Sequence, residues 1–365
     1  MRILILANND VGLYKFRKEL IEKLLADGNE VYISLPDGEL VRPLQDMGCI
    51  FLKTDIDRRG LNPVKDLKLV NEYQKIVKTY KPDMVITYTI KPNIYGGFVS
   101  KMKNIPYAVN ITGLGTAFQN EGLLKKMVTT MYKTALKKAK VVYFENIENQ
   151  NIFLDNKIIK SSQAHLLNGA GVNLDHYTYT EYPSSNKEVR FLFVGRVMKE
   201  KGIDELFDAL KRLIKENHAC ILDVVGGYEE NYSEVIKRYE NEGWLKYHGY
   251  QKDVRPFIAN AHCFVLPSYH EGMANTNLES AAMGRPLITS NIHGCKEAVV
   301  ENQSGYLCEP KNSESLYETM KSFLLLSHDE KVQMGRMGRK HMEDVFDKNK
   351  VVEDTLTILC KRVNV

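Results

Sequence analysis

The chain has 365 residues, of which 44% are hydrophobic and 26% charged, and its net charge at pH 7 is +4. This composition excludes wholesale disorder, and the length is more than twice the ~150 residues typical of one domain, so we expect two domains. The longest apolar runs fall short of the ~18 residues that a membrane span needs, and the mild charge indicates no nucleic-acid partner.

The cysteines and the first residues bear on the compartment. Six cysteines are scattered along the chain, and none forms a C-x-x-C pair. This pattern argues against a zinc ribbon, a dithiol redox motif and a disulfide scaffold. Residues 1–6 enter a strand pattern directly, so we expect no signal peptide and a cytoplasmic location.

The first half alternates apolar runs with helical patterns. Residues 2–7 predict a buried strand, a helical pattern with leucines at three- and four-residue spacing follows, and 31–35 predict the next strand. Further strands are expected at 84–87, 107–111 and 141–144, with helical stretches between them. This alternation predicts the α/β class with a parallel sheet.

The second half repeats the same order. It begins with a strand at 189–194, continues through a polar loop at 195–202 into a helix at 203–214, and returns to a strand at 220–225. The two copies of this strand–helix–strand order predict two doubly wound, Rossmann-like domains. Because open parallel sheets bind ligands beyond the carboxyl ends of their strands, we expect the two domains to face each other across a cleft.

A polar stretch at 179–187 separates the two copies. We therefore expect an N-terminal domain at 1–180 and a C-terminal domain at 186–347. A helical pattern fills 348–365. This last helix either packs on its own domain or returns to the N-terminal one.

The chain lacks the common phosphate-binding motifs. It contains no G-x-x-x-x-G-K-[ST], and neither its first loop nor 113–115 completes G-x-G-x-x-G, so a nicotinamide or flavin dinucleotide is poorly supported. Instead, the loop after the strand at 189–194 contains Arg196 and Lys201. A guanidinium fork and a compact ammonium together suit a diphosphate, although such a pair can also be an ordinary solvated surface.

A second motif lies between the strand expected at 262–267 and a helix expected to begin near Asn277. Glu271 and Glu279 stand eight positions apart there. A helix N-terminus binds anions, and flanking carboxylates accept hydrogen bonds from the hydroxyls of a sugar and a ribose. Glu279 could equally cap the helix or form an ion pair.

In combination, these motifs resemble the retaining nucleotide-sugar glycosyltransferases of family 4, which have the GT-B fold. The resemblance over 191–309 rests on G-R-x4-K-G at 195–202, V-V-G-G at 224–227, H-G-Y at 248–250, E-x7-E at 271–279 and G-R-P at 284–286. Over 1–140 it is looser, and there 14–17, 87–93 and 110–115 resemble the bacterial subgroup that builds capsule, O-antigen and lipid-linked oligosaccharides.

The resemblance implies that the domain at 1–180 binds the acceptor and that the domain at 186–347 binds the donor. It also implies a role for each matching position. Arg196 and Lys201 would hold the donor diphosphate and stabilise its charge as it leaves, and Glu271, the third catalytic candidate, would bind the hydroxyls of the hexose. The resemblance leaves open whether Glu271 is a nucleophile or whether the leaving phosphate is the base in a same-face substitution. It implies no metal and no cofactor. The other implied donor-binding residues are Gly195, Tyr250, Gln251, Met273, Ala274, Asn275, Thr276 and Glu279.

On the acceptor side, a helix is expected within 122–140, with Lys126, Lys133, Lys137 and Lys140 on one face and apolar residues on the other. Such a helix could lie on an anionic bilayer or pack on the first domain with its lysines solvated. Because the resembled subgroup acts on polyprenyl-diphosphate sugars, we expect a peripheral enzyme on the cytoplasmic face of the membrane. The candidate acceptor contacts are Asn9, Tyr14, Arg17, Lys91, Thr112 and Gly113, and Lys91 could equally be a plain surface lysine.

We therefore expect transfer of a hexose or N-acetylhexosamine from a nucleotide-sugar, most simply a UDP-sugar, to a polyprenyl-diphosphate-linked saccharide. Two alternatives remain: a UDP-sugar 2-epimerase of the same architecture and a non-catalytic sugar-nucleotide-binding protein. The pairing of G-R-x4-K-G with E-x7-E favours transfer, and a non-catalytic protein would be expected to lack Glu271, Arg196 or Lys201.

Overall fold

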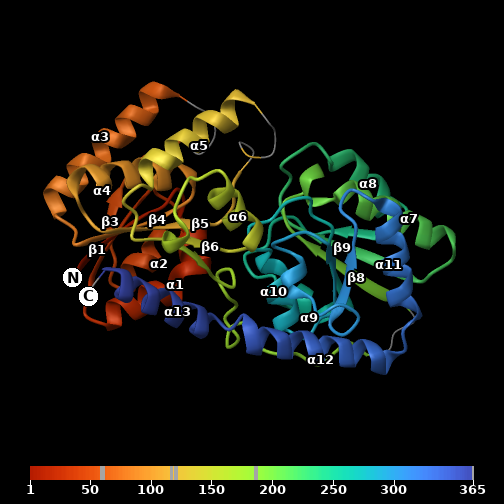
Figure 1. Cartoon of the computed structure of the whole chain (residues 1–365). Helices are drawn as coiled ribbons and strands as arrows, with labels where there is room; N and C mark the ends of the chain where they lie inside the picture. Colours follow the sequence, from red (N-terminus) through yellow and green to blue (C-terminus); the bar gives the residue numbers. More distant parts are fainter. Residues whose placement is uncertain (58–61, 116–117, 119–121, 185–187, 364–365) are drawn as a thin grey trace. The chain divides into compact units, whose positions relative to one another are not determined.

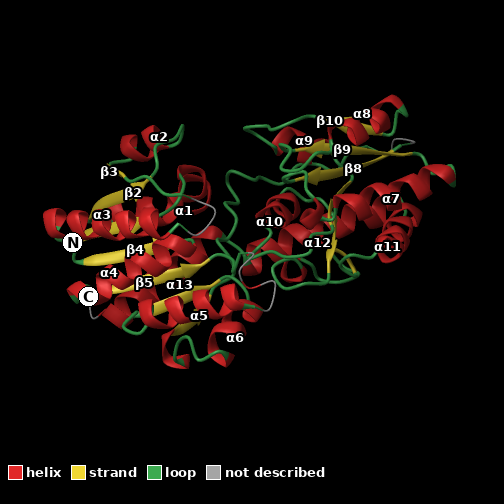
Figure 2. Ribbon diagram, turned by 90° about the horizontal axis from the view of Figure 1, so that it is seen from above, coloured by secondary structure: helices red, strands yellow, loops and turns green. Residues whose placement is uncertain are grey.

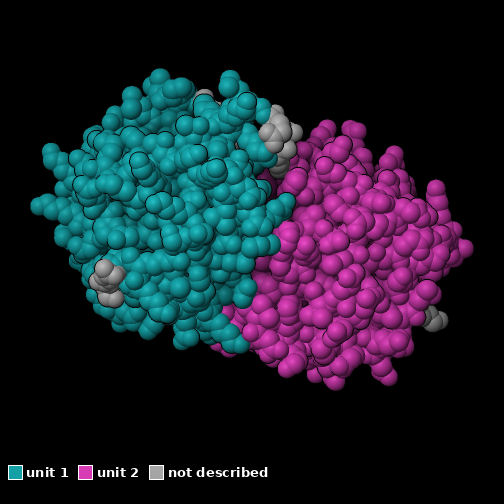
Figure 3. All heavy atoms as spheres, in the orientation of Figure 1, with its two compact units in different colours: residues 1–170, 349–365 teal, residues 171–348 magenta. Residues whose placement is uncertain are grey.

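The structure, a computed structural model, describes residues 1–57, 62–115, 118, 122–184 and 188–363. The chain divides into two compact units, which Figure 3 colours separately. Unit 1 comprises Met1–Ala170 and Asn349–Val365, and unit 2 comprises Gly171–Lys348. Each contains a parallel sheet between layers of helices (Figures 1 and 2), so the predicted pair of α/β, Rossmann-like domains is confirmed.

The sheet of unit 1 has seven described strands in the order β3-β2-β1-β4-β5-β6-β7. Their bounds are β1 (Arg2–Leu6), β2 (Glu30–Leu35), β3 (Ile50–Lys53), β4 (Met84–Tyr88), β5 (Tyr107–Ile111), β6 (Val141–Phe144) and β7 (Ala164–Leu166). In the central strand Leu4 lies between Tyr32 of β2 and Val85 of β4. The strand order therefore reverses between β1 and β4, where α/β sheets usually bind ligands.

Helices cover both faces of this sheet (Figure 1). One core cluster joins the sheet to α1 (Asp10–Ala26), α2 (Val41–Asp46) and α13 (Lys348–Val363). The other joins it to α3 (Pro63–Tyr80), η1 (Pro92–Gly96), α4 (Gly97–Lys103), α5 (Leu123–Ala135) and α6 (Ile147–Asp155). The Tyr143 hydroxyl of β6 donates a hydrogen bond to the Thr355 carbonyl of α13 (2.7 Å). The last helix therefore belongs to unit 1, which was one of the two alternatives.

The sheet of unit 2 has six described strands in the order β10-β9-β8-β11-β12-β13, which repeats the order of the first six in unit 1. The strands are β8 (Val189–Val194), β9 (Cys220–Val225), β10 (Leu245–Tyr247), β11 (Cys263–Leu266), β12 (Leu287–Ser290) and β13 (Gly305–Cys308). The helices are η4 (Lys199–Lys201), α7 (Ile203–Lys215), α8 (Ser233–Asn241), α9 (Arg255–Asn260), α10 (Asn275–Ala282), η5 (Lys296–Ala298), α11 (Ser313–Leu325) and α12 (His328–Val345).

The division between the units falls at residue 170, ten residues before the end predicted for the first domain. The physical reason is hydrogen bonding of the segment that follows. Val172 donates its amide to the Phe346 carbonyl (2.7 Å), and the buried guanidinium of Arg285 donates to the carbonyl oxygens of Thr180 (2.8 Å) and Glu181 (2.9 Å). This segment is therefore part of unit 2. Residues 185–187 of the predicted linker lie outside the described residues.

The helix predicted within 122–140 is shorter than expected. It ends at Ala135, whose carbonyl accepts a hydrogen bond from the Tyr107 hydroxyl (2.6 Å), and the Gln163 amide binds the Leu136 and Ala139 carbonyls. Side chains thus take the places of helical amides, and the lysines at positions 137 and 140 lie beyond the helix.

Candidate functional site

Two loops of unit 2 meet beyond the carboxyl ends of β8 and β11, at the point where the strand order reverses. Gly202 ends the first loop with a φ of +70°, and a Cβ there would lie 2.0 Å from the Pro267 carbonyl oxygen. The Glu200 carbonyl accepts hydrogen bonds from the Tyr269 amide (2.9 Å) and the Ser268 hydroxyl (3.3 Å). The two loops are therefore held together by main-chain contacts that only glycine at 202 permits.

This close approach brings two of the three predicted catalytic residues together. The Lys201 ammonium forms an ion pair with Glu271 Oε1, and the two side chains are only 18% and 13% exposed. Lys201 comes from the loop after β8 and Glu271 from the loop after β11. A partly buried ion pair at the switch point is therefore the centre of the candidate site.

Arg196, the third predicted catalytic residue, lies on the same loop as Lys201 but is arranged differently. Its side chain is 54% exposed, and its closest carboxylate is Glu229, at 3.6 Å. The preceding residue, Gly195, has its carbonyl oxygen 1.8 Å from where a Cβ on Gly226 would stand. The ends of β8 and β9 therefore also approach closely. Arg196 is thus a solvent-facing cation on the loop that carries Lys201, and it is not part of the Lys201–Glu271 ion pair.

The helix predicted near Asn277 is α10, and it begins two residues earlier than expected, at Asn275. Ala274 is its N-cap, because the Ala274 carbonyl accepts from the Asn277 amide (2.9 Å) while the Ala274 amide donates to the Gly294 carbonyl (2.7 Å). Four of the implied donor-binding residues lie at 273–276, and the resemblance implies that they bind through their backbone amides. The amide of Ala274 is already occupied, and the Met273 side chain is buried in the core.

The remaining two predicted backbone donors, Asn275 and Thr276, form the first turn of α10. Amides of a first helical turn have no acceptor within the helix, and the positive end of the helix dipole favours anions. The first turn of α10 contains no acidic residue, and its N-cap makes no side-chain hydrogen bond. The amides at this helix terminus can donate hydrogen bonds to a phosphate or a sugar oxygen.

Glu279 lies one turn further along α10 and is partly buried. The Tyr177 side chain is hydrogen-bonded to it, and burial together with the charge of Glu279 raises the pKa of Tyr177 well above its usual value. Tyr177 is not among the predicted residues. No sequence motif marks it, because it reaches Glu279 from the segment before the predicted start of the second domain.

The loop after β10 contains Tyr250, which is exposed, and Gln251, whose amide donates to the His248 carbonyl (2.7 Å). The His248 ring is hydrogen-bonded to Asp223 Oδ1 (2.6 Å), and Arg190 donates a hydrogen bond to the other oxygen of this buried carboxylate (2.6 Å). The loop predicted to lie beside the nucleotide base is thus anchored by an arginine–aspartate–histidine network. Sequence analysis named only His248 of these three.

In unit 1, the candidate acceptor residue Arg17 lies on α1. Its guanidinium forms a largely buried ion pair with Glu145, directly after β6, and stands 5.0 Å from the ring centroid of Tyr88 at the end of β4. Arg17 is therefore neither a solvated helix residue nor an unpaired phosphate ligand. Sequence analysis missed Glu145, which is 7% exposed.

Two other candidate acceptor residues of unit 1 also have structural partners. The Asn9 side chain caps α1 by accepting from the Gly12 amide (2.6 Å). The Lys91 ammonium pairs with Asp66 of α3 (2.8 Å), and both side chains are largely buried, so the surface-lysine alternative is wrong.

Of the three remaining candidates, two directly follow a strand and one lies on α1. Tyr14 is partly buried against the core on the α1 face, while Thr112 and Gly113 directly follow β5. Glu145, Lys91 and Thr112 each follow the carboxyl end of a strand in one sheet. Unit 1 thus gathers several of its predicted residues at this edge of the sheet.

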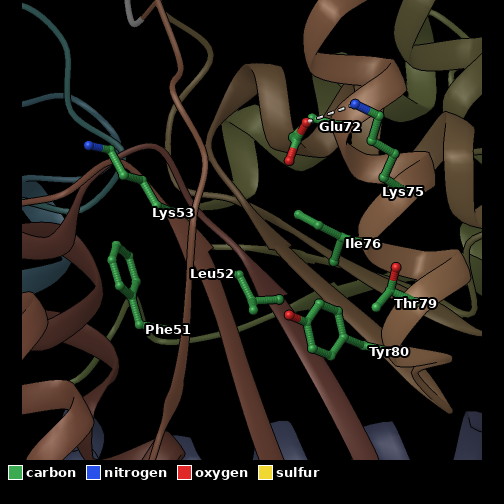
Figure 4. A pocket seen from close by; sticks show the side chains of 8 residues that line it. All are labelled: Phe51, Leu52, Lys53, Glu72, Lys75, Ile76, Thr79 and Tyr80. Atoms are coloured by element: carbon green, nitrogen blue, oxygen red, sulfur yellow. Dashed lines mark ion pairs between the residues drawn. The ribbon is translucent and has the colours of Figure 1, made fainter.

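A pocket of about 350 Å³ lies elsewhere in unit 1, between β3 and α3 (Figure 4). It is lined by Phe51, Leu52, Lys53, Glu72, Lys75, Ile76, Thr79 and Tyr80. None of these is a predicted site residue. Within the described ranges, no group of three or more histidine, cysteine or acidic side chains gathers as a metal site, and the metal-free chemistry stays a prediction.

Comparison with known families matches both halves of the chain. Residues 2–146 match the model described as "Glycosyl transferase 4-like", and residues 180–341 match "Glycosyl transferases group 1". The chain is a glycosyltransferase. The family resemblance that the motifs predicted is therefore confirmed, and the protein is an enzyme of this class.

Curated relatives of this glycosyltransferase include two enzymes with lipid-linked acceptors in their names. An N,N'-diacetylbacillosaminyl-diphospho-undecaprenol α-1,3-N-acetylgalactosaminyltransferase of Campylobacter jejuni is 27% identical over 98% of each chain. A UDP-Gal:α-D-GlcNAc-diphosphoundecaprenol α-1,3-galactosyltransferase of Escherichia coli is 26% identical over 72% of this chain and 71% of its own.

Solved structures confirm the fold. A glycosyltransferase of Rickettsia africae superposes with a TM-score of 0.83 at 20% identity, covering 99% of this chain and 98% of its own. Anabaena HepE, crystallised with UDP and glucose, superposes with a TM-score of 0.81 at 16% identity, covering 99% and 100%. The predicted GT-B architecture is therefore correct.

Proposed function

We propose that this glycosyltransferase moves a hexose or N-acetylhexosamine from a UDP-sugar to a polyprenyl-diphosphate-linked saccharide, at the inner face of the cell membrane. The observation that carries the donor half is the Lys201–Glu271 pair beside the N-terminus of α10. The acceptor half is supported by the named activities of the Campylobacter and Escherichia relatives.

In the donor site, cations and amides would bind the diphosphate, and carboxylates would bind the hydroxyl groups. Lys201, Arg196 and the first-turn amides of α10 would bind the diphosphate and stabilise the charge that builds up as the glycosidic bond breaks. Glu271 would accept hydrogen bonds from sugar hydroxyls, and Glu279, held by Tyr177, those of the ribose. A preorganised cluster of this kind supplies the electrostatic stabilisation that the transfer needs.

Exposed aliphatic side chains in unit 1 suit a lipid-linked acceptor. The first turns of α3 and α5 expose Val64 (78%), Leu67, Leu123 (85%), Leu124 and Met127. The two helices lie on the same face of the sheet (Figure 1), and α5 contains three lysines and no acidic residue. Aliphatic side chains beside lysines match the apolar interior and anionic headgroups of a bilayer.

The burial of α5 agrees with the second of the two alternatives that the amphipathic pattern left open, packing on the first domain. Val128, Tyr132 and Ala135 of α5 are buried in unit 1, so the helix packs on its own domain along most of its length. Only its first turns present apolar side chains outward. No helix in the described part of the chain is long and apolar enough to cross a membrane.

The donor half is tested by thermal stabilisation with UDP, GDP, ADP and NAD. A ligand at about 100 times its Kd stabilises the folded state by about 2.7 kcal/mol. We expect a UDP-selective shift that weakens in Arg196→Ala and persists in Arg42→Ala, a control at an exposed arginine of unit 1. A shift with NAD alone would refute the proposal, and selectivity for GDP or ADP would change the donor.

The transfer reaction is tested with UDP-sugars and a synthetic polyprenyl-diphosphate N-acetylhexosamine. Formation of a lipid-linked disaccharide supports the proposal. Release of UDP with free N-acetylmannosamine would instead identify a 2-epimerase, and binding without turnover would identify a sugar-nucleotide-binding protein.

Membrane placement is tested by co-sedimentation with phosphatidylcholine vesicles that do or do not contain phosphatidylglycerol. We expect binding that needs the anionic lipid and weakens in Leu123→Ser/Leu124→Ser. Leu325→Ser is the matched control, because Leu325 is 74% exposed but lies in unit 2. Equal loss in both variants, or no vesicle binding by the wild type, would contradict a lipid-docking role for α5.

A further inference from the structure

The charge of Lys201 is neutralised by Glu271 in the structure. Both side chains are largely withdrawn from water, so their attraction is less screened than that of a surface pair. A diphosphate that binds Lys201 therefore competes with Glu271 for its ammonium. As the ammonium turns toward the diphosphate, Glu271 keeps less of its counterion and lies close to a second anion.

The two partners differ in mobility. The Glu271 backbone is wedged against Gly294, where a Cβ would lie 2.6 Å from the Glu271 carbonyl oxygen, and the Ala274 amide binds the Gly294 carbonyl. Lys201, in contrast, carries its charge on a flexible four-carbon stem. The ammonium thus has the longer reach of the two partners, while the carboxylate is attached to a main chain that is held in place.

The neighbouring cation, Arg196, is not held by a buried carboxylate as Lys201 is. It is 54% exposed and 3.6 Å from Glu229. An exposed pair at that distance contributes little, because water and salt screen it. The cost of exchanging partners therefore falls on Lys201 and Glu271.

We propose that the Lys201–Glu271 ion pair discriminates between the sugar-nucleotide and the nucleoside diphosphate that remains after transfer. This inference rests on the proposed donor site. A sugar-nucleotide compensates Glu271 with hydrogen bonds from its hydroxyls while its diphosphate takes Lys201. UDP offers no such hydroxyls at that position, so Glu271 recaptures Lys201 and UDP leaves.

The test compares Kd values of UDP and of the UDP-hexose that the wild type binds most tightly, measured by calorimetry. In Glu271→Gln we expect UDP to bind about tenfold more tightly, which corresponds to about 1.4 kcal/mol, and the UDP-hexose to bind more weakly. Glu314→Gln is the control, because it removes the same charge from an exposed ion pair of unit 2, with Arg212. There we expect both Kd values to stay within about twofold, since exposed pairs contribute little.

Each outcome decides something. If Glu271→Gln binds UDP no more tightly than the wild type, the discrimination role is wrong while the proposed function stands. If the wild type binds neither UDP nor a UDP-hexose, both fall. Should Glu271→Gln not fold, Glu271→Asp replaces it, because withdrawing the carboxylate by one methylene weakens the same pair. UDP binding by that variant must then tighten in the same direction, and unchanged binding would overturn the inference.

Discussion

Gly202 offers the sharpest test of how the candidate site is assembled. Its φ of +70° lies in the left-handed region, and the Cβ of an alanine would stand 2.0 Å from the carbonyl oxygen and 2.7 Å from the carbonyl carbon of Pro267. The obstacle is main chain at the end of β11, which cannot rotate away as a side chain could. In Gly202→Ala the loops after β8 and β11 must therefore separate.

The cost has two parts. An L-residue in the left-handed region costs about 1–2 kcal/mol, and forcing atoms into a packed region costs about 1–3 kcal/mol. Gly243 isolates the first part, because its φ is +87° and a Cβ there would meet nothing within 4 Å. We expect Gly243→Ala to destabilise unit 2 by about 1–2 kcal/mol and Gly202→Ala by about 2–5 kcal/mol.

Urea unfolding followed by tryptophan fluorescence measures this difference. Trp244 is the only tryptophan of the chain and is buried in the core of unit 2, so its emission reports on that unit. Because the separating loops carry Lys201 and Glu271, Gly202→Ala should also weaken UDP binding, whereas Gly243→Ala should not. Equal destabilisation by the two substitutions would show that the close approach does not require glycine.

Three further predictions concern buried polar groups. Burial lowers the pKa of His262 to about 4, so between pH 6.5 and 4 the unfolded chain binds a proton that the folded chain does not. The free energy of unfolding of unit 2 should therefore fall by about 2 kcal/mol from pH 7 to pH 5. His262→Asn should flatten this dependence in urea titrations followed by Trp244. Glu145→Ala leaves the Arg17 guanidinium buried without its carboxylate and should destabilise unit 1 by about 3 kcal/mol in thermal unfolding, a result that an unchanged melting temperature would contradict. Tyr177→Phe removes the hydrogen bond to Glu279 and should raise the KM for the UDP-sugar several-fold with kcat nearly unchanged, whereas a loss confined to kcat would argue against a role in ribose binding.

Much of the fold could be predicted because its strands are buried on both faces. Such strands appear as continuous apolar runs, and those expected at 107–111, 141–144, 189–194 and 220–225 have the bounds that the structure gives them. The repeat of strand, loop and helix in the second half likewise follows from local patterns. The right-handed crossovers that are usual in α/β units narrow the possible sheet orders to a few.

The partners of the site residues could not be predicted in the same way. Arg17 and Glu145 are 128 positions apart, and only the neighbouring places of β4, β5 and β6 in the sheet bring α1 and the end of β6 together. The end of α5 at Ala135 depends on Tyr107 and Gln163, which compete for its last carbonyls from other elements. Local sequence patterns contain no information about such long-range hydrogen bonds.

The candidate cations Arg17 and Lys91 of unit 1 are paired with carboxylates, as Lys201 of unit 2 is. In unit 1 the predicted cations Arg17 and Lys91 are each neutralised by a largely buried carboxylate, so their main contribution is to hold α1 and α3 against the strand ends. The exposed positive charge near the apolar turns of α5 comes instead from lysines such as Lys126 and Lys133. A lipid diphosphate approaching unit 1 would therefore meet the α5 lysines more readily than Arg17 or Lys91, which moves the expected acceptor contacts from the strand ends toward the helix surface.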